Sequence, residues 1–446
     1  MDIAGLIPVF GNIIWTIAAF ITALSVIVAI HEYGHYIVGR WSGIKAEVFS
    51  IGFGPVLASR VDKHGTRWQI AALPFGGFVK FLGDAGAASD KDSDVMDGLS
   101  DDQRRASMHG APLWARTLTV AAGPVFNFIL SFLIFAVLIM YRGVAADPIT
   151  VDELRALPNA PAAGLQTGDV ILRVEGEPVP ATDDFSTFAR ELTPVPTPTY
   201  SVDRNGSILD VPGPWLYPIY VASVTPNWAA DEAGLEVGDV ITAVDGVDIF
   251  DFEQLREIVG ASDGAELTLD VWRDGNTEQF TLAPARRDLP LSDGGFETRW
   301  LIGLSGGLAF EPASTTPSLG AAALYGVDQI RFIITSSLSG LYHMVVGKIS
   351  TCNLSGPIGI AETSGQAASQ GWFNFIYFIA LLSTAVGLIN LFPIPVLDGG
   401  HLVFYAFEAL TGRPPSDRAL KYLMVGGLTL MLGLMVFSVG NDLVCP

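Results

Sequence analysis

The chain has 446 residues, of which 50% are hydrophobic and 16% are charged, and its mean hydropathy is positive. This composition is too apolar for a soluble protein of this length and indicates a membrane protein. The formal net charge of -21 argues against a nucleic-acid-binding protein, because contact with phosphates needs clustered Lys and Arg side chains. Most of the acidic residues lie between Asp147 and Glu311, as expected for one solvated, soluble region.

The first expected membrane span carries no charged residue from position 9 to position 30. We predict a helix that crosses the bilayer here and continues through His35, because about 20 apolar residues suffice for a crossing. The residues before it lack the basic region and the small-residue cleavage site of a signal peptide, so we expect this helix to be retained.

The motif His31-Glu32-Tyr33-Gly34-His35 lies at the end of this span. Two histidines four residues apart share one face of a helix, and the pattern HExxH is typical of zinc hydrolases. His31 and His35 are therefore candidate zinc ligands, and Glu32 is the candidate general base. Ionisable residues are costly at membrane depth, which favours a functional site over a chance match in a buried helix.

The loop that follows, 36–112, is rich in Lys and Arg and contains two extended segments around a glycine turn. We expect a β-hairpin with arms at 47–60 and 66–73. Its glycine-rich apolar stretches are suited to dipping into the membrane near the metal, where an edge strand could pair with a peptide. A plain surface hairpin is the alternative. The candidate peptide contacts in this loop are Gly52, Gly54, Gly76 and Gly77.

The second expected span, 117–141, is followed by the acidic region, which contains an internal repeat. The residues AGLQTGDVI at 163–171 return as AGLEVGDVI at 233–241. In both copies a glycine turn leads into Val-Ile and then into Val-x-Gly, which indicates turn, strand and turn. The pattern resembles a PDZ domain, and an unrelated pair of β-rich domains is the alternative.

We expect PDZ-like α+β domains at 146–215 and 216–286. The second copy is the fuller one, whereas prolines interrupt the first. Strands are expected at 219–224, 266–272 and 279–282 and a helix at 251–259, and the interrupting residues are Pro194, Pro196 and Pro198. Such domains often bind a peptide as an added strand, so peptide C-termini are candidate partners. A steric filter above the membrane is an equal expectation.

The segment 287–370 is expected to be a linker that includes an amphipathic helix at 320–346. Charged residues within that apolar stretch favour a position on the membrane surface over a crossing. Three histidines, His64, His109 and His343, stand alone in the sequence and are expected to be surface or structural residues.

The third expected span, 371–397, contains Pro393 and Pro395 and is followed directly by Asp398. Proline breaks a helix, and non-helical backbone at membrane depth is tolerated where it lines a cavity. Two histidines leave a catalytic zinc one protein ligand short, and we predict that Asp398 supplies it. The alternatives are that Asp398 caps a helix outside the bilayer or that His401 is the ligand.

The fourth expected span is 422–441. Lys and Arg residues gather in the loop after the HExxH motif and in the short loop before this span, and both are expected to be cytoplasmic. The chain termini and the region 142–318 then face the other side. Cys352 and Cys445 would share that side, where a disulfide is permitted, and two free thiols are the alternative.

Together these motifs resemble the site-2 protease family of intramembrane zinc metalloproteases, and most closely its bacterial RseP-type regulators of sigma-E. The resemblance covers nearly the whole chain. It rests on the HEYGH motif in the first span, NLFPIPVLDG at 390–399 and the repeated domains between them. Three further stretches are similar to the family: GPVFNF at 123–128, PFGGFVK at 74–80 and NLSGPIG at 353–359.

The resemblance implies a polytopic α-helical membrane protein of the bacterial inner membrane, with four transmembrane helices and two inserted PDZ-like domains. The membrane halves would be 1–145 and 371–446. The repeated region would be periplasmic and the active site near the cytoplasmic side. The expected substrates are single-pass membrane proteins cut in or near their transmembrane helix. A membrane protein that restrains a sigma factor and remnant signal peptides are the family's examples.

For individual residues, the resemblance implies that His31, His35 and Asp398 hold Zn²⁺ and that Glu32 is the base. It also implies that Asn390 helps to hold the substrate. The two prolines of the broken span, Pro393 and Pro395, are expected beside it at the substrate site. A catalytically inert scaffold and a transporter with an ion site at the broken helix are the competing hypotheses. The complete catalytic set argues against the first, and the lack of an inverted repeat argues against the second.

Overall fold

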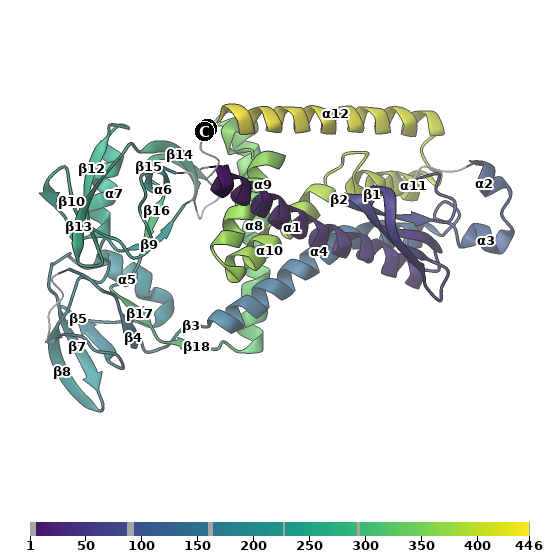
Figure 1. Ribbon diagram of the computed structural model, residues 1–446. Coiled ribbons are helices and arrows are strands. Elements are labelled where there is room, and N and C mark those ends of the chain that lie inside the picture. Colours follow the sequence, from purple (N-terminus) through teal and green to yellow (C-terminus); the bar gives the residue numbers. More distant parts are fainter. Residues whose placement is uncertain (1–5, 87–92, 159–163, 226–227, 292–294, 446) are drawn as a thin grey trace. The chain divides into compact units, whose positions relative to one another are not determined.

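The computed structural model describes residues 6–86, 93–158, 164–225, 228–291 and 295–445 (Figure 1). The chain divides into two compact units. The first unit combines Met1–Leu138 with Leu319–Pro446, and the second unit is Ile139–Ser318. The second unit is therefore an insertion between two halves of the first.

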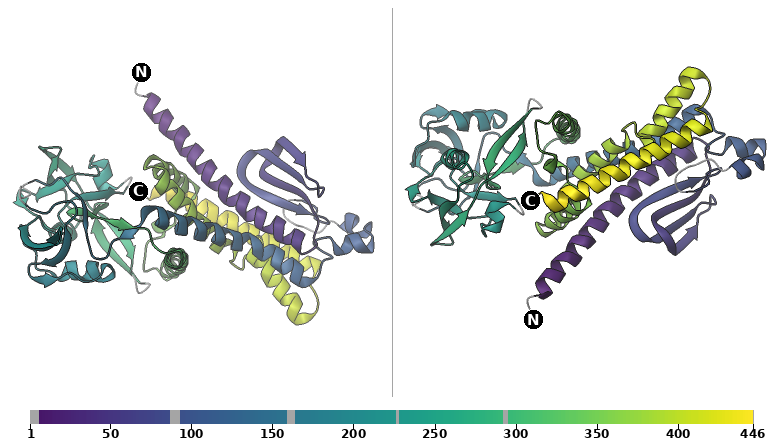
Figure 2. Two further views of the ribbon diagram at one scale, coloured as in Figure 1. Left: turned by 90° about the horizontal axis from the view of Figure 1, so that it is seen from below. Right: turned by 90° about the horizontal axis from the view of Figure 1, so that it is seen from above.

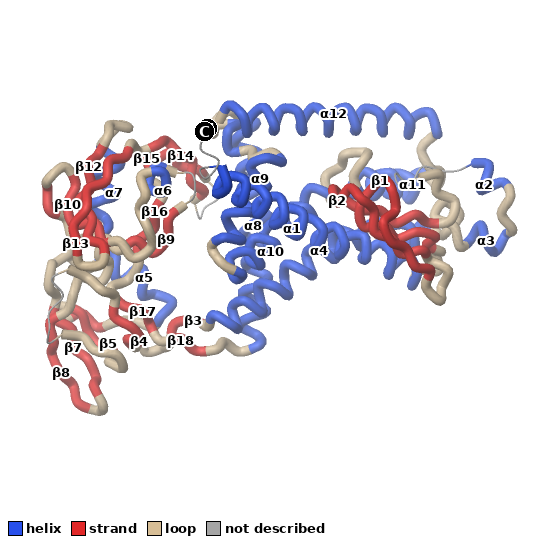
Figure 3. Tube along the Cα trace, viewed as in Figure 1, coloured by secondary structure: helices blue, strands red, loops and turns tan. Residues whose placement is uncertain are grey.

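The first unit is mainly helical (Figure 3). Its helices are α1 (Leu6–Trp41), α2 (Ser93–Asp97), α3 (Asp101–Arg105), α4 (Leu113–Arg142), α8 (Leu319–Val345), α9 (Pro357–Ser369), α10 (Trp372–Asn390), α11 (Asp398–Thr411) and α12 (Asp417–Val444). Its described residues also form the strands β1 (Ala46–Val61) and β2 (Arg67–Phe81).

Among the described residues, α1, α4, α10 and α12 are long and apolar enough to cross a membrane. They correspond to the four spans predicted from the sequence. Large apolar side chains cover their exposed faces, including Leu133 of α4 and Leu428 and Leu432 of α12. Such extended apolar surfaces require an apolar surrounding, which a bilayer supplies. The helix predicted at 320–346 is present as α8, and its location on the membrane surface stays a prediction.

The third span is shorter than predicted. The helix α10 ends at Asn390 instead of continuing to 397, and a new helix, α11, starts at Asp398. Pro393 and Pro395 explain the gap, because proline lacks an N–H donor and disfavours helical backbone in the residue before it. The chain between the two helices is made of turns, so Asp398 stands in the first turn of α11.

Buried polar contacts connect α4 to α10 inside the unit. The hydroxyl of Ser131 donates to the carbonyl oxygen of Ala380 at 2.8 Å, and the hydroxyl of Ser383 donates to that of Asn127 at 3.0 Å. Ser131, Ser383 and Asn127 are completely buried. Such hydrogen bonds fix how two apolar helices face each other, since apolar packing alone is weakly directional.

The strands β1 and β2 form the predicted hairpin, and β2 continues beyond the predicted arm to Phe81. Each strand folds back on itself, so that Ala46 pairs with Phe81 at one end and Val61 pairs with Arg67 at the turn. The segments 56–61 and 77–81 are the two outer parts of this sheet. The sheet lies beside the C-terminal half of α1, which contacts both strands (Figure 2).

The carboxylate of Asp62 organises the turn of the hairpin and ties it to α1. It accepts hydrogen bonds from the backbone N–H groups of His64 and Thr66, from the indole of Trp68 and from the hydroxyl of Tyr36. Burial alone would raise the pKa of the Asp62 carboxyl, but these hydrogen bonds outweigh it and lower the pKa to about 2. The hairpin is therefore anchored to α1 by a carboxylate that stays ionised.

The second unit contains two four-stranded sheets with the same strand arrangement, β6-β5-β7-β8 and β11-β10-β12-β13. The first half has β3 (Val144–Ala145), β4 (Val151–Leu154), β5 (Val170–Val174), β6 (Glu177–Pro178), α5 (Phe185–Glu191), β7 (Thr199–Arg204) and β8 (Ser207–Pro212). The second half has β9 (Val221–Val224), α6 (Ala229–Glu232), β10 (Val240–Val244), β11 (Val247–Asp248), α7 (Phe252–Ala261), β12 (Leu267–Arg273) and β13 (Asn276–Leu282). The strands and the helix predicted in the second copy are thus present.

The sequence repeat has a structural counterpart in two equivalent ion pairs. Asp169 is bound by the guanidinium of Arg204 at 2.7 Å, and Asp239 is bound by that of Arg273 at 2.6 Å. Both aspartates are buried and also accept a backbone hydrogen bond from their own turn. The three prolines expected to interrupt the first copy precede β7 and leave its sheet complete.

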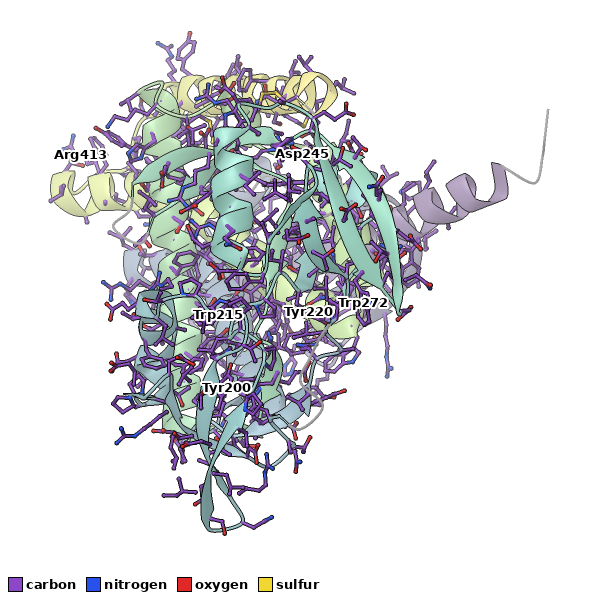
Figure 4. The ribbon with its side chains drawn as sticks, turned by 90° about the vertical axis from the view of Figure 1, so that its left-hand side faces the viewer. Tyr200, Trp215, Tyr220, Asp245, Trp272 and Arg413 are labelled. Carbon is purple, nitrogen blue, oxygen red and sulfur yellow. A yellow bond between two sulfur atoms is a disulfide. The ribbon has the colours of Figure 1, made fainter. Side chains whose placement is uncertain are left out.

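A hydrogen bond between buried side chains connects the two halves of the second unit. The indole of Trp215, which is labelled in Figure 4, donates to the carboxylate of Asp251 at 2.8 Å. The residues after 284 form strands, although the sequence predicted a linker from 287. They are β14 (Ala285–Pro290), β15 (Phe296–Leu301), β16 (Leu304–Gly306), β17 (Phe310–Pro312) and β18 (Ser314–Thr315). Because β18 pairs with β3 and β17 pairs with β4, the two ends of the insertion lie side by side.

Cys352 and Cys445 form a disulfide, with their Cα atoms 5.5 Å apart, so the two-free-thiol alternative does not hold. The same region contains a helix cap supplied by another helix. The carboxylate of Asp442 in α12 accepts hydrogen bonds from the backbone N–H groups of Gly356 and Gly359 at the start of α9, as well as from that of Ile358. The end of α12 is therefore fixed to the start of α9.

Candidate metal centre and active site

The HExxH residues lie on α1, and the helical period brings His31 and His35 to the same face. Asp398 approaches them from the start of α11, where the broken backbone after α10 turns the chain. The oxygen Oδ2 of Asp398 lies 3.1 Å from Nε2 of His31 and 3.4 Å from Nε2 of His35. The two Nε2 atoms are 3.2 Å apart. Residues from both ends of the chain thus converge on one point.

These three atoms fit a zinc ion. Ligand atoms bonded to a tetrahedral zinc at about 2.0–2.2 Å lie about 3.3–3.6 Å from one another. The separations of 3.1, 3.2 and 3.4 Å among the three donor atoms are close to that spacing. Oδ2 of Asp398 is buried and has no hydrogen-bond partner among the described residues, so it is available as a ligand. Three protein ligands leave one coordination position open, as in catalytic zinc sites.

The helix α4 packs against His31 and His35 and helps to hold their rings in position. The Nδ1–H of His35 donates to the backbone carbonyl oxygen of Thr119 at 2.8 Å, which leaves Nε2 free to bind a metal. One turn further along, Gly123 lies so close that a Cβ atom there would be 2.3 Å from Nε2 of His35. The glycine therefore permits the close approach of α4 to the two histidines.

The donor atoms open into a cavity of about 470 Å³. Glu32, the candidate base, lines this cavity but does not belong to the group of donor atoms. Val79 of β2 lines the same cavity, and a Cβ atom on Gly77 would lie 3.2 Å from Cγ of Glu32. The outer segment of the hairpin thus forms one wall of the cavity, next to the carboxylate.

The structure brings some of the predicted substrate residues to the cavity. Asn390 and Gly77 line it, whereas Pro393, Pro395, Gly52, Gly54 and Gly76 are not among the described residues that do so. The three glycines have positive φ angles of 91°, 83° and 132°, which suits the sharp bends of the hairpin. The two prolines end α10. A role of these five residues in substrate binding stays a prediction.

His401, the alternative third ligand, lines the same cavity but lies outside the group of donor atoms among the described residues. His109 also lines the cavity, although the sequence suggested an isolated histidine. Its Nε2 atom lies 3.1 Å from Oδ1 of the buried Asp84. The sequence carried no signal for this pair, because neither residue belongs to a recognisable motif.

The sequence also did not predict a second polar feature of the cavity wall, an ion pair between α4 and α11. The guanidinium of Arg116 in α4 donates to both carboxylate oxygens of Glu408 in α11, at 3.1 and 2.7 Å. Such two-point pairs fix the relative position of two helices as well as their charges. The only available signal was an arginine near the start of the second span and a glutamate shortly after Asp398. Nothing in the sequence indicates that the two meet.

Comparison with known proteins identifies the family. The family model "Peptidase family M50" matches residues 19–434. A protein of Agrobacterium fabrum named "Putative zinc metalloprotease" is 36% identical over 433 residues, which cover 96% of this chain and 95% of the relative. The "Regulator of sigma E protease" of Salmonella typhimurium is 32% identical over 462 residues, which cover 97% and 99%. The resemblance inferred from the motifs is therefore confirmed, and the chain belongs to peptidase family M50 and is a zinc metalloprotease.

Proposed function

We propose that this metalloprotease is an intramembrane endopeptidase, which hydrolyses a peptide bond in or near the transmembrane helix of a membrane protein. The observation that carries the proposal is the position of the donor group. His31 and His35 lie within a helix that is long and apolar enough to cross a membrane, and Asp398 follows the break after another such helix. A protease that cuts only soluble chains would not need its ligands at that depth.

His31, His35 and Asp398 would hold the zinc ion, which supplies Lewis-acid activation of water and of the scissile carbonyl. The Glu32 carboxylate borders the same cavity and is free of the ligand group, so it can accept the proton of the attacking water. The same carboxyl group can then return a proton to the leaving amide nitrogen.

A substrate helix must unwind before its carbonyl groups can be attacked, because each is bonded within the helix. The outer segment 77–81 of β2 supports a site for the unwound strand. It borders the cavity beside Glu32, and an extended peptide can pair with the backbone at the edge of a sheet. Asn390 also lines this cavity and offers a side-chain amide for such a peptide.

The test uses purified full-length protein, its bound zinc and a model transmembrane substrate. Glu32→Gln should keep its zinc and lose cleavage by about 10²–10⁴-fold, because the base is not a ligand. His31→Ala, His35→Ala and Asp398→Ala should lose both zinc and cleavage. Glu362→Gln, an exposed carboxylate on α9, serves as the control and should behave as wild type. Cleavage by Glu32→Gln at the wild-type rate would refute the mechanism and favour an inert scaffold.

The proposed location is the bacterial inner membrane, with the second unit periplasmic and the metal centre near the cytoplasmic side. The distribution of Lys and Arg supports this orientation. Single cysteines at Lys63 and Asn276, both exposed, would test it in cells with a permeabilised outer membrane. A membrane-impermeant thiol reagent should label Asn276→Cys but not Lys63→Cys, and the reverse result would contradict the orientation.

We further propose that the halves of the second unit are PDZ-like domains at 146–215 and 216–286. The matching sheets and the repeated ion pairs support it. A groove of about 610 Å³ beside α7, lined by Phe252, Leu255 and Val259, could take a peptide C-terminus. Titration of the full-length protein with fluorescent apolar-ended peptides tests this, and unchanged binding by Leu255→Arg would contradict it.

The substrates we propose are single-pass membrane proteins, including one that restrains a sigma factor, and remnant signal peptides. The name of the Salmonella relative and the family resemblance support the first class. To test the assignment, wild type and Glu32→Gln would each be incubated with membranes. Proteins that are shortened only by wild type would then be identified. Shortened proteins without any transmembrane segment would contradict it.

A further inference from the structure

The face of α4 formed by Thr119, Gly123 and Asn127 lies against the backs of both metal-site histidines. The three residues are spaced four apart and therefore share one side of the helix. Thr119 accepts a hydrogen bond from Nδ1 of His35, and Gly123 makes room for the two rings. Asn127 stands at the equivalent place for His31, with its amide nitrogen 3.2 Å from Nδ1.

Metal binding through Nε2 determines what the Nδ1 atom of each histidine ring needs as a hydrogen-bond partner. A neutral histidine that binds a metal through Nε2 carries its proton on Nδ1, and that N–H needs an acceptor. The carbonyl of Thr119 is such an acceptor for His35. An amide nitrogen is a donor, so it cannot serve His31 in the same way. The Oδ1 atom of Asn127 can, and it is buried without a hydrogen-bond partner among the described residues.

The backbone carbonyl group of Asn127 is held in place by two hydrogen bonds, whereas its side-chain amide can turn. Its carbonyl oxygen accepts hydrogen bonds from the hydroxyls of Ser131 and Ser383, each at 3.0 Å. The residue itself is completely buried. A half-turn of the amide exchanges its oxygen and nitrogen without altering its shape. In a buried apolar setting, an unpaired amide oxygen beside an unpaired N–H would cost about 1–3 kcal/mol.

We propose that Asn127 is a positioning residue for His31, and that its side-chain amide selects the tautomer in which Nε2 can bind the metal. In this role the amide oxygen, which a half-turn brings to the place of the amide nitrogen 3.2 Å from Nδ1, accepts a hydrogen bond from Nδ1–H. The lone pair of Nε2 then points toward Oδ2 of Asp398, 3.1 Å away. This inference rests on the proposed ligand role of His31 and adds the group that selects its tautomer.

Two substitutions at one position separate hydrogen bonding from packing. Asn127→Leu keeps the approximate volume and removes the acceptor, and we expect its zinc affinity to fall about 10–100-fold. Asn127→Asp keeps an acceptor in both orientations, and we expect its zinc affinity to equal or exceed that of wild type. Thr384→Val is the matched control. It removes a buried hydroxyl whose hydrogen bond, among the described residues, goes to the carbonyl oxygen of Ala380 within α10, and its zinc affinity should stay at the wild-type level.

The measurement is competition for zinc between the purified full-length protein and a chelator, supported by the absorption spectrum of the cobalt-substituted protein. A loss in Asn127→Leu that Asn127→Asp does not share supports the proposal. Equal losses in both variants, or no loss in Asn127→Leu, would overturn it. If wild type itself bound no zinc, the proposed function would fail first, so the two failures can be told apart.

A second measurement needs no substitution at Asn127 and so does not depend on the folding of a variant. In ¹⁵N-histidine-labelled wild type, the signals of His31 can be assigned by their loss in His31→Gln. The zinc-loaded protein should show the proton of His31 on Nδ1, because Asn127 supplies the acceptor for it. A zinc-loaded protein with this proton on Nε2 would contradict the proposal.

Discussion

At the residue scale, the candidate metal centre depends on how closely a helix can approach two imidazole rings. The pairs of donor atoms are separated by 3.1–3.4 Å only because nothing projects from α4 at Gly123. A glycine within a membrane helix lowers helix propensity, so its presence here calls for a packing reason. The close approach of the two histidines provides this reason, since the ring of His35 occupies the space that a side chain at Gly123 would need.

We predict that Gly123→Ala loses zinc although it improves helix propensity. A Cβ atom at 2.3 Å from Nε2 and 2.5 Å from Cε1 of His35 has to displace the ring, because α4 is held to α10 nearby. Zinc affinity should fall by at least about tenfold, the usual range for a disturbed outer shell. Gly433→Ala in α12 is the control, since a Cβ atom there meets nothing within 4 Å. Chelator competition on both variants measures the effect, and equal zinc affinities would show that the ring tolerates the methyl group.

The sequence reveals the local part of this site and hides the rest. His31, Glu32 and His35 could be predicted because their spacing is set by one helix turn. Asp398 could be predicted because prolines and an aspartate are unusual in an apolar segment. The contact of Arg116 with Glu408 joins residues 292 positions apart, so it depends on helix packing that no local pattern encodes. The roles of Thr119 and Asn127 are hidden for the same reason.

At the element scale, the breaks in helices and strands position the residues of the candidate active site. The turns between α10 and α11 put an aspartate in a helix's first turn, facing two histidines of α1. The hairpin shows the limit of sequence reasoning in the same way. Its second arm was expected to end at 73, but β2 continues to Phe81, because its last segment pairs with the start of β1. That long-range pairing brings Gly77 to the cavity, and it could not be inferred from the glycines alone.

The connection between α12 and α9 gives a prediction at this scale. Cys352 and Cys445 are 93 residues apart in the chain and are joined in the structure, next to the Asp442 cap. We expect a thiol reagent to label neither cysteine in denatured protein that was kept unreduced, and to label both after reduction. Mass spectrometry of the labelled chain reads the result directly. Two labelled cysteines before reduction would show that the pair is open in the cell, and would remove the support it gives to a non-cytoplasmic location.

At the scale of the whole molecule, the second unit is an insertion whose ends meet. The backbone N–H of Ala146 donates to the carbonyl oxygen of Ala313 at 2.7 Å, and β3 pairs with β18 just outside this contact. The donor atoms and the cavity that opens from them are built entirely from residues of the first unit. Chemistry and selection of substrates can therefore belong to separate parts of one chain. This is the arrangement expected if the two halves, which we propose to be PDZ-like domains, act as a gate.

Excision of the second unit tests this division of roles. Replacing residues 147–312 by a short Gly-Ser linker should leave zinc affinity close to that of wild type, because the joined ends already lie within hydrogen-bonding distance. Substrates that have already lost their outer domain should be cut as before. Intact substrates, which we expect wild type to reject, should now be cut as well. The same excision combined with Glu32→Gln should cut neither, which shows that the original site acts. The excised protein could bind zinc and insert correctly and still fail to cut the shortened substrates. That result would mean that the second unit takes part in catalysis, because the metal centre alone would then be insufficient.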